Sequence, residues 1–374
     1  MISVFDIFKI SIGPSSSHTV GPMKAGKQFV DTLQEKGLLH KVTRLVVDVY
    51  GSLSLTGKGH HTDIAIILGL SGYLPDTVDI DAIPGIIRDV NTMHRLFIEE
   101  GQREIQFPVA ECMRFHNEFL PLHENGMSIT AFCDGKIVHF QTYYSIGGGF
   151  IVTEENFGKN LEAEVDIPFP FYSARNLLAH CQNNCLSISA VMMKNETARH
   201  GRENVEQNMA KIWETMRNAI NRGMNTEGIL PGPLKVPRRA SALHRVLAPQ
   251  SQSITPLSAM DWVNMFAMAV GEENASGGRV VTAPTNGACG IVPAVLAYYD
   301  RFIKEVTPEI YMRYFLTAGR NRHSVQDERL HFRGRGRLPG RSGRGLLDGV
   351  CRTGRAAGWQ SGEGVHRRGD RHGA

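Results

Sequence analysis

The hydrophobic and polar positions of the first 155 residues alternate between helical and extended patterns. An amphipathic helical pattern begins at Pro22, and an alternating, β-branched run over Val42–Tyr50 predicts a strand. An apolar helix is expected over Ile64–Leu70, with Thr62 or Asp63 as its cap. This mixture predicts a mixed α/β lobe.

A β-hairpin closes this lobe. Two runs of strand character, Ser128–Cys133 and Lys136–Tyr144, flank the dipeptide Asp134-Gly135. That dipeptide suits a type I′ turn, in which both central residues have positive φ. Three glycines at 147–149 then end the unit, so we place the mixed α/β lobe at residues 1–155.

Helical patterns dominate after a Pro- and Phe-rich linker at residues 156–172. Ser173 and Ser187 are expected to cap two helices, and Gly223 suits the position after a third. The predicted helices are Ala174–Cys181, a helix through Met193, Glu203–Arg222, Asp261–Val270 and Ile291–Phe302. The fold class is therefore α+β, with an all-α lobe at residues 173–319.

The composition changes after Gly319. Residues 320–374 hold 13 Arg, five acidic residues and no Lys, a local charge of +8 that leaves −4 for residues 1–319. The body of the chain thus gives no electrostatic case for nucleic acid, and the tail, which lacks apolar periodicity, is expected to be disordered. With no apolar run long enough for a membrane span and no signal-peptide pattern, a cytoplasmic protein without disulfides is expected.

The first candidate site is the string GPSSSHTVGPM, which precedes the predicted helix from Pro22. The hydroxyls of Ser15, Ser16, Ser17 and Thr19 can donate to a substrate carboxylate, and His18 can act as a general base near neutral pH. The alternative is a solvated serine loop that only caps the helix.

The second candidate site is the string GKGHHTD. One histidine of the pair His60 and His61 could transfer a proton. Adjacent histidines point apart, which disfavours a shared metal ion. The alternative is a surface loop.

The third candidate site is the string APTNGACG before Ile291. Thr285 and Asn286 offer hydrogen bonds, Gly287 permits close approach of a ligand, and Cys289 near a helix start is expected to have a lowered pKa. The alternative is a tight turn with a buried cysteine. Weaker candidates are the turn at His123 and the pair Arg238 and Arg239, for which a solvated basic edge is the default.

Six strings together resemble the bacterial single-chain iron–sulfur L-serine dehydratases over about the first 319 residues. They occur here in the family's order: GPSSSHTVGPM, YGSLSLTGKGH, LHENGM, YYSIGGGF, RGMNTEGILPGPL and GGRVVTAPTNGACGIVPAVLAYYD. The resemblance implies a small α/β domain and a larger helical catalytic domain. It also implies deamination of L-serine to pyruvate and ammonia, a step of amino-acid degradation and gluconeogenesis.

The resemblance implies a cofactor and site residues. The family uses a [4Fe–4S] cluster, held by cysteines, as a Lewis acid on the substrate hydroxyl, and it does without pyridoxal phosphate. Its essential histidines correspond to His18 and His60. The Ser15–Ser17 run, with Thr19 and Lys58, and the Thr285–Gly287 loop are the expected substrate contacts. No membrane partner is implied, and a homodimer is left open.

The family's cluster cysteines are expected beyond Gly319, where this chain departs from the family. Codons can be chosen for residues 320–349 that encode a family-like continuation when the first base of the Arg320 codon is dropped. We therefore interpret the tail as a frameshifted sequence, and we expect this chain to be inactive because it lacks the cluster ligands. Two other readings remain: a non-catalytic serine-binding module, and RNA binding through the Arg/Gly tail.

Overall fold

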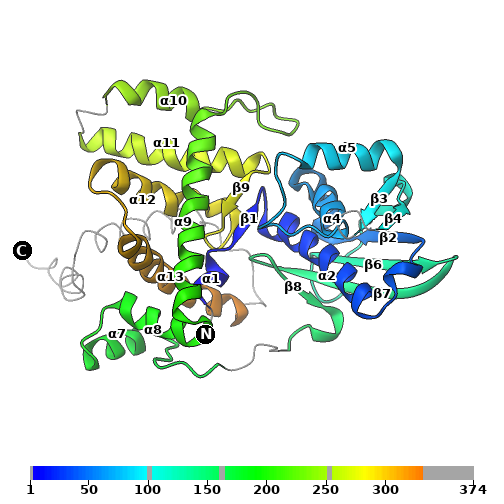
Figure 1. Cartoon of the computed structure of the whole chain (residues 1–374), viewed down its shortest axis with the longest axis horizontal. Helices are drawn as coiled ribbons and strands as arrows, with labels where there is room; N and C mark the ends of the chain where they lie inside the picture. The colour runs from blue at the N-terminus through cyan, green and yellow to red at the C-terminus, as the bar shows by residue number, and fades with distance from the viewer. Residues whose placement is uncertain (1–2, 99–102, 160–164, 251–254, 332–374) are drawn as a thin grey trace, which may run out of the picture.

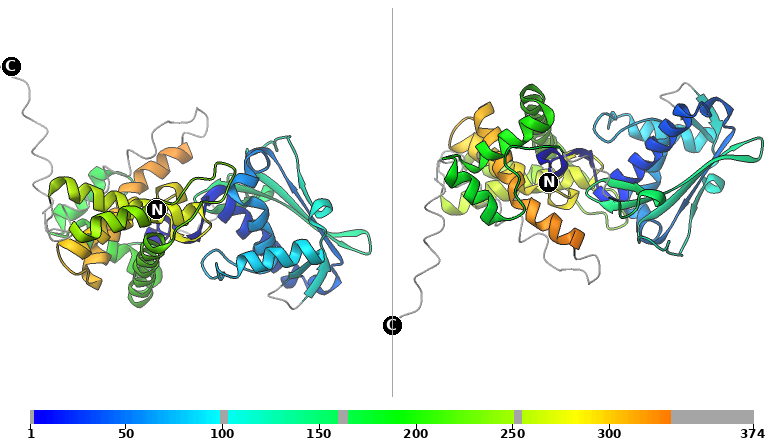
Figure 2. Two further views of the ribbon diagram at one scale, coloured as in Figure 1. Left: turned by 90° about the horizontal axis from the view of Figure 1, so that it is seen from above. Right: turned by 90° about the horizontal axis from the view of Figure 1, so that it is seen from below.

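The chain folds into two lobes that lie side by side (Figures 1 and 2). The computed structural model describes residues 3–98, 103–159, 165–250 and 255–331. One lobe combines helices with a mixed sheet and is called the small lobe; the other is the helical lobe. This arrangement confirms the α+β fold class.

The small lobe is built on a seven-stranded sheet with the order β3-β4-β2-β6-β7-β8, in which β5 also pairs with β2. Strand β2 runs parallel to β4 and β5 and antiparallel to β6. The strands are β2 (Arg44–Val49), β3 (Arg95–Ile98), β4 (Arg103–Gln106), β5 (Met113–Phe115), β6 (Gly126–Cys133), β7 (Lys136–Gly147) and β8 (Phe150–Thr153). The helices are α2 (Gly21–Glu35), α3 (Gly51–Leu55), α4 (Thr62–Leu70), α5 (Ile83–Met93) and α6 (Val109–Cys112), with short turns η1 (Ser16–Val20), η2 (Leu39–Lys41), η3 (Gly57–His60) and η4 (Glu154–Asn156).

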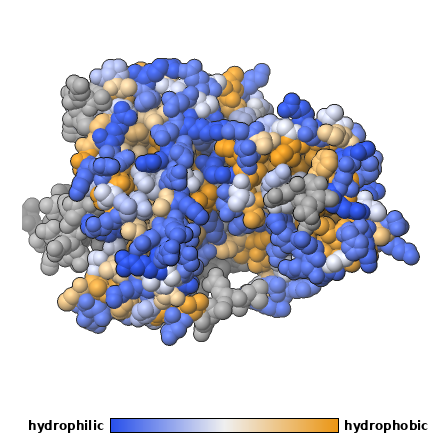
Figure 3. Space-filling model, in the orientation of Figure 1, coloured by the Kyte–Doolittle hydropathy of each residue, from blue (hydrophilic) through white to orange (hydrophobic). Residues whose placement is uncertain are grey.

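Helices α2 and α4 pack together on the face of the sheet that is turned toward the helical lobe (Figure 2). Their apolar residues, such as Phe29 and Ile66, share one core with strand residues such as Val47 and Ile129. Around α4 and α5, partly buried side chains give this lobe a hydrophobic area, whereas the visible face of α9 is hydrophilic (Figure 3).

The predicted hairpin is confirmed. Strands β6 and β7 pair antiparallel, and the pair of residues nearest the turn is Cys133 opposite Lys136. Both turn residues have positive φ, 48° at Asp134 and 81° at Gly135, as a type I′ turn requires.

The helical lobe surrounds two apolar cores. Ser173 and Ser187 cap α7 and α8 as predicted, since their hydroxyls accept from the backbone N–H groups of Asn176 and Ala190. The helices are α1 (Val4–Ile7), α7 (Ala174–Asn183), α8 (Ile188–His200), α9 (Arg202–Asn225), α10 (Ala240–Leu247), α11 (Pro256–Ala275), α12 (Ile291–Phe302) and α13 (Pro308–His331), with short turns η5 (Ala248–Gln250) and η6 (Asn286–Ala288).

The helical lobe also holds a two-stranded sheet that the sequence pattern did not predict. Strand β1 (Ile10–Ile12) pairs antiparallel with β9 (Arg279–Val281). The residues just before β1, including Val4, Ile7 and Phe8, are buried in the core of the helical lobe. The N-terminal segment therefore joins the two lobes.

Two predicted helix ends are wrong. Helix α9 runs past Gly223 to Asn225, because this glycine serves close packing: an added Cβ would lie 2.2 Å from the carbonyl oxygen of Ala269 on α11. Helix α4 is preceded by His61 at φ 55°, and neither Thr62 nor Asp63 caps it. The Thr62 hydroxyl donates instead to the His18 carbonyl.

The C-terminal segment enters the structure only in part. Helix α13 extends to His331, and the remainder of the tail predicted to be disordered, residues 332–374, lies outside the described residues. The predicted helix Ile291–Phe302 is present as α12 and buries Val292, Leu296 and Tyr299. Among the described helices, none combines the length and the apolar character that crossing a bilayer requires.

Candidate active site

Two histidines from separate motifs meet in the small lobe. His18 lies in η1, a π-helical turn that leads directly into α2, and His60 ends η3, just before α4. Their ring centroids are 4.9 Å apart, with the ring planes inclined by 40°. Because α2 and α4 pack closely, their N-terminal ends bring the first two predicted motifs together.

Reciprocal hydrogen bonds connect the two motifs. The Thr19 hydroxyl donates to the carbonyl of His60 at 2.7 Å, and the Thr62 hydroxyl donates to the carbonyl of His18 at 2.6 Å. Both threonines are almost completely buried. Each histidine backbone is thus held by a side chain from the other motif, which fixes the spacing of the rings.

The three serines of the first loop make different contacts. Ser15 is the N-cap of η1, and its hydroxyl accepts from the backbone N–H of His18 at 3.2 Å. The Ser17 hydroxyl lies 2.9 Å from Nδ1 of His18, whereas Ser16 is buried. The first candidate string is therefore helical from Ser16 onward.

Hydroxyl groups contact both ring nitrogens of His18. Nε2 lies 3.1 Å from the hydroxyl of Ser52 on α3, opposite the contact of Nδ1 with Ser17. Burial, and then the nearby ring of His60, lower the pKa of His18, while Ser52 and Glu124 act in the opposite direction. His18 is therefore neutral near pH 7, the form that accepts a proton.

The tautomer of His60 follows from its partner. Its Nδ1 lies 2.9 Å from the carbonyl oxygen of Thr56. A carbonyl only accepts hydrogen bonds, so Nδ1 carries the proton and Nε2 is the basic nitrogen of the neutral ring. The neighbouring His61 has a pKa lowered by burial, and its ring lies near Gly277 of the helical lobe.

The third motif reaches the first loop from the helical lobe. The side-chain nitrogen of Asn286 donates to the carbonyl of Ile12 at 3.0 Å and to Oδ1 of Asn274 at 2.9 Å. Asn274 in turn donates to the carbonyl of Pro14 at 3.0 Å. The loops that contain His18 and Asn286 therefore meet where the two lobes join.

Several predicted residues lie at the margin of this arrangement. Lys58 and Gly287 are exposed, and Thr285 is half-buried before η6. The expectation for Cys289 is wrong: the thiol is fully buried, and desolvation raises its pKa to about 12. Burial outweighs any effect of the nearby helix start, so this cysteine is neither a thiolate nucleophile nor a ready ligand.

Three contacts were missed at the sequence level. Ser52 contacts Nε2 of His18, Asn274 joins the two loops, and the Ser145 hydroxyl donates to the carbonyl of Ser17 at 2.7 Å. Ser52 and Ser145 lie inside two of the six quoted strings, which was the available signal. Asn274 lies beyond the predicted end of its helix at Val270, and nothing local set it apart.

The weaker candidates have structural partners. The turn at His123 adjoins the His18 region, since the carbonyl of Glu124 accepts from the backbone N–H of Ser52. The Arg238 side chain is not part of a solvated edge: it is 8% exposed and pairs with Glu273 at 2.8 Å, whereas Arg239 is exposed as expected. The backbone N–H of Arg239 donates to Glu272.

The cysteines do not form a cluster site in the described part of the chain. Cys112 is buried in the small lobe and Cys133 lies in β6, whereas Cys181, Cys185 and Cys289 belong to the helical lobe. No group of three or more His, Cys, Asp or Glu side chains that could hold a metal ion occurs among the described residues. These residues therefore do not fit the iron–sulfur cluster implied by the sequence resemblance.

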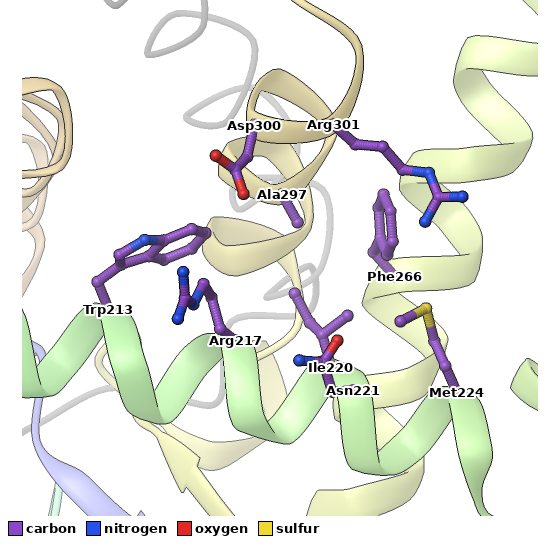
Figure 4. Close-up of a pocket in the computed structure, with 9 residues that line it drawn as sticks. All are labelled: Trp213, Arg217, Ile220, Asn221, Met224, Phe266, Ala297, Asp300 and Arg301. Carbon is purple, nitrogen blue, oxygen red and sulfur yellow. The ribbon is translucent and has the colours of Figure 1, made fainter. Parts of the chain in front are cut away.

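A separate pocket of about 310 Å³ opens between α9, α11 and α12 (Figure 4). Its apolar side chains are Trp213, Ile220, Met224, Phe266 and Ala297, and its polar ones are Arg217, Asn221, Asp300 and Arg301. None of them belongs to the three motifs, so this pocket is distinct from the histidine site.

Two protein-family models match the chain. The family model for the serine dehydratase beta chain matches residues 3–156, and the one for the alpha chain matches residues 183–325. The chain is 65% identical over 319 residues to L-serine dehydratase 2 of Escherichia coli K12. It is 57% identical over 321 residues to an L-serine dehydratase of Haemophilus influenzae and 44% over 322 residues to one of Streptomyces coelicolor. Each alignment covers 85% of this chain and 70% of the relative.

Proposed function

The chain belongs to the serine dehydratase family, and we propose that it binds L-serine beside His18 and His60, where the lobes join. The reaction of this site type is that of an L-serine ammonia-lyase, which forms pyruvate and ammonia. High identity to proteins named L-serine dehydratases supports the reaction class. One observation carries the proposal: His18 and His60 come from two separate motifs, and their ring centroids lie 4.9 Å apart.

The elimination requires a base for the Cα proton and a proton for the departing hydroxyl. Two histidines side by side can perform both tasks when one is neutral and the other protonated. The lowered pKa of His18 suits it to accept a proton. Since Nδ1 of His60 is held by the Thr56 carbonyl, its Nε2 is the nitrogen left for proton transfer. Loss of water gives an enamine, whose imine tautomer hydrolyses to pyruvate and ammonia.

We further propose that this chain, as written, binds L-serine without turning it over. The described residues do not fit an iron–sulfur cluster, and the Arg/Gly-rich composition of residues 320–374 differs from that of the rest of the chain. A shifted reading frame from Arg320 accounts for that change of composition. In this proposal the chain keeps its contacts to the substrate but lacks the iron–sulfur cluster that would activate the substrate hydroxyl.

Calorimetric titration of the full chain with L-serine tests the binding site. We expect saturable binding that weakens at least about tenfold in His18→Gln and His60→Gln, because each loses an imidazole ring that is proposed to contact the substrate. His40→Gln, at an exposed position in η2, is the matched control and should bind like the wild type. Unchanged affinity in both site variants would refute the assignment of these histidines.

A pyruvate assay separates the two parts of the proposal. Lactate dehydrogenase and NADH report pyruvate directly. We expect the full wild-type chain to release pyruvate no faster than a double variant that carries His18→Gln and His60→Gln. Turnover by the full chain would disprove its inactivity but support the site. Absence of both binding and turnover would contradict the proposed function itself.

A further inference from the structure

The last turn of α11 joins the proposed site to the rest of the helical lobe. Glu272 accepts from the backbone N–H groups of Arg239 and Ala240, and Glu273 pairs with Arg238. Asn274, directly after them, reaches the two loops of the site. An added Cβ on Gly13 would lie 1.7 Å from the Asn274 carbonyl oxygen, so the first loop lies directly against this turn.

The partners of Asn274 determine which way its amide points. Its nitrogen lies 3.0 Å from the carbonyl of Pro14, and a carbonyl accepts but never donates. The amide nitrogen must therefore face Pro14, which leaves Oδ1 facing Asn286. The orientation follows from the neighbour and does not depend on telling nitrogen from oxygen.

The same reasoning passes to Asn286. Its amide lies 2.9 Å from Oδ1 of Asn274 and 3.0 Å from the carbonyl of Ile12, and both partners are acceptors. The group that meets them must be the nitrogen. Oδ1 of Asn286 is therefore an oxygen of fixed position that can only accept a hydrogen bond.

That oxygen is buried and has no hydrogen-bond partner among the described residues. Asn286 as a whole is 1% exposed. A buried acceptor without a donor costs about 1–3 kcal/mol, so this oxygen needs a donor, which a bound ligand can supply. A carboxylate carries no donor and would be repelled by this oxygen.

We propose that Asn274 is a positioning residue, which orients Asn286 so that Oδ1 of Asn286 accepts from the α-ammonium group of the substrate. The substrate carboxylate then lies toward the hydroxyls of the serine loop instead of toward Asn286. This inference rests on the proposed L-serine site and assigns the orientation of the amino acid within it.

Two ligands distinguish this orientation in the wild-type chain. L-serine and 3-hydroxypropanoate share the carboxylate and the hydroxyl, but only L-serine has the ammonium group. We expect L-serine to bind at least about tenfold more tightly by calorimetry, the size of one hydrogen bond to a charged group. Equal affinities would overturn the inference, whatever the variants do.

Asn274→Leu then tests the role of Asn274. We expect this substitution to weaken the binding of L-serine about tenfold and the binding of 3-hydroxypropanoate much less. The preference for L-serine, measured as the dissociation constant of 3-hydroxypropanoate divided by that of L-serine, should therefore fall. A merely structural role would weaken both ligands equally and leave the ratio unchanged, which would overturn the assignment. Asn204→Leu makes the same change on the exposed surface of α9, where its amide donates to the His200 carbonyl, and should keep the wild-type ratio.

Failure of the inference is distinguishable from failure of the proposed function. If the wild type binds neither ligand, the serine site itself is wrong. If it binds L-serine and the ratio stays unchanged in Asn274→Leu, only the role of Asn274 is wrong. Thermal unfolding of each variant establishes that the compared proteins are folded, and the wild-type ratio stands without any variant.

Discussion

Replacing Gly69 by alanine should disturb the histidine site from a distance, because this glycine sets the spacing of α2 and α4. An added Cβ would lie 2.0 Å from the carbonyl oxygen of Met23, whereas ordinary contact begins at 3.4 Å. The helices would have to separate by about 1.4 Å at this point. Since α2 follows His18 and α4 follows His60, the separation acts on the spacing of the two rings.

The magnitude follows from two opposing terms. Overpacking of a close contact costs about 1–3 kcal/mol. Alanine is favoured over glycine inside a helix by about 1 kcal/mol, which offsets part of that cost. Gly271→Ala is the matched control: it lies within α11, and an added Cβ there meets nothing within 4 Å. The difference between the two variants therefore isolates the packing term.

Chemical and thermal unfolding measure this difference. We expect Gly69→Ala to be less stable than Gly271→Ala by about 1–3 kcal/mol, with a midpoint of thermal unfolding lower by several degrees. L-serine affinity should fall in Gly69→Ala and stay unchanged in Gly271→Ala. Equal stability of the two variants would show that the α2–α4 contact does not set the helix spacing.

Three further predictions concern other parts of the chain. Burial raises the pKa of Glu196 above its usual 4.5, so the stability that this residue contributes is present at low pH and is lost as pH rises through the raised pKa. In thermal unfolding measured at a series of pH values, Glu196→Gln should become increasingly more stable than the wild type as the pH rises. Arg238→Met removes the nearer of the two arginine partners of the buried Glu273 carboxylate, with Arg222 remaining at 3.2 Å, and should lower the free energy of unfolding by about 1–3 kcal/mol in a urea titration. Removing one base at the Arg320 codon should give a protein with visible iron–sulfur absorption and serine dehydration, and a colourless, inactive product would refute the frameshift interpretation.

The elements that the sequence predicted well are those determined by local chemistry. The Asp134-Gly135 turn and the caps at Ser173 and Ser187 depend on one or two residues and their immediate neighbours, and all three are confirmed. Strand β9 was not predicted, because three residues carry no periodic signal and its partner β1 lies at the other end of the sequence. Gly223 was misplaced because a glycine that ends a helix and one that permits close packing look alike in sequence.

The site shows the same division. The strings around His18, His60 and Asn286 singled out these residues, although their roles in serine binding remain predictions. Ser52 and Asn274 were missed, since their importance comes from what they touch after folding. The pKa of Cys289 was misjudged because its position before a helix is visible in the sequence, whereas its complete burial depends on tertiary packing.

The pairing of β1 with β9 has a consequence for the order of folding during synthesis. Ile10 lies opposite Val281, so the first strand of the chain has no partner until about 270 residues later. The core of the small lobe uses residues between Ala25 and Tyr143 and can assemble while the rest is still being translated. The N-terminal segment, with Val4, Ile7 and Phe8, must then dock late. Until that moment its apolar side chains are open to chaperones, and the junction of the lobes is among the last parts of the molecule to form.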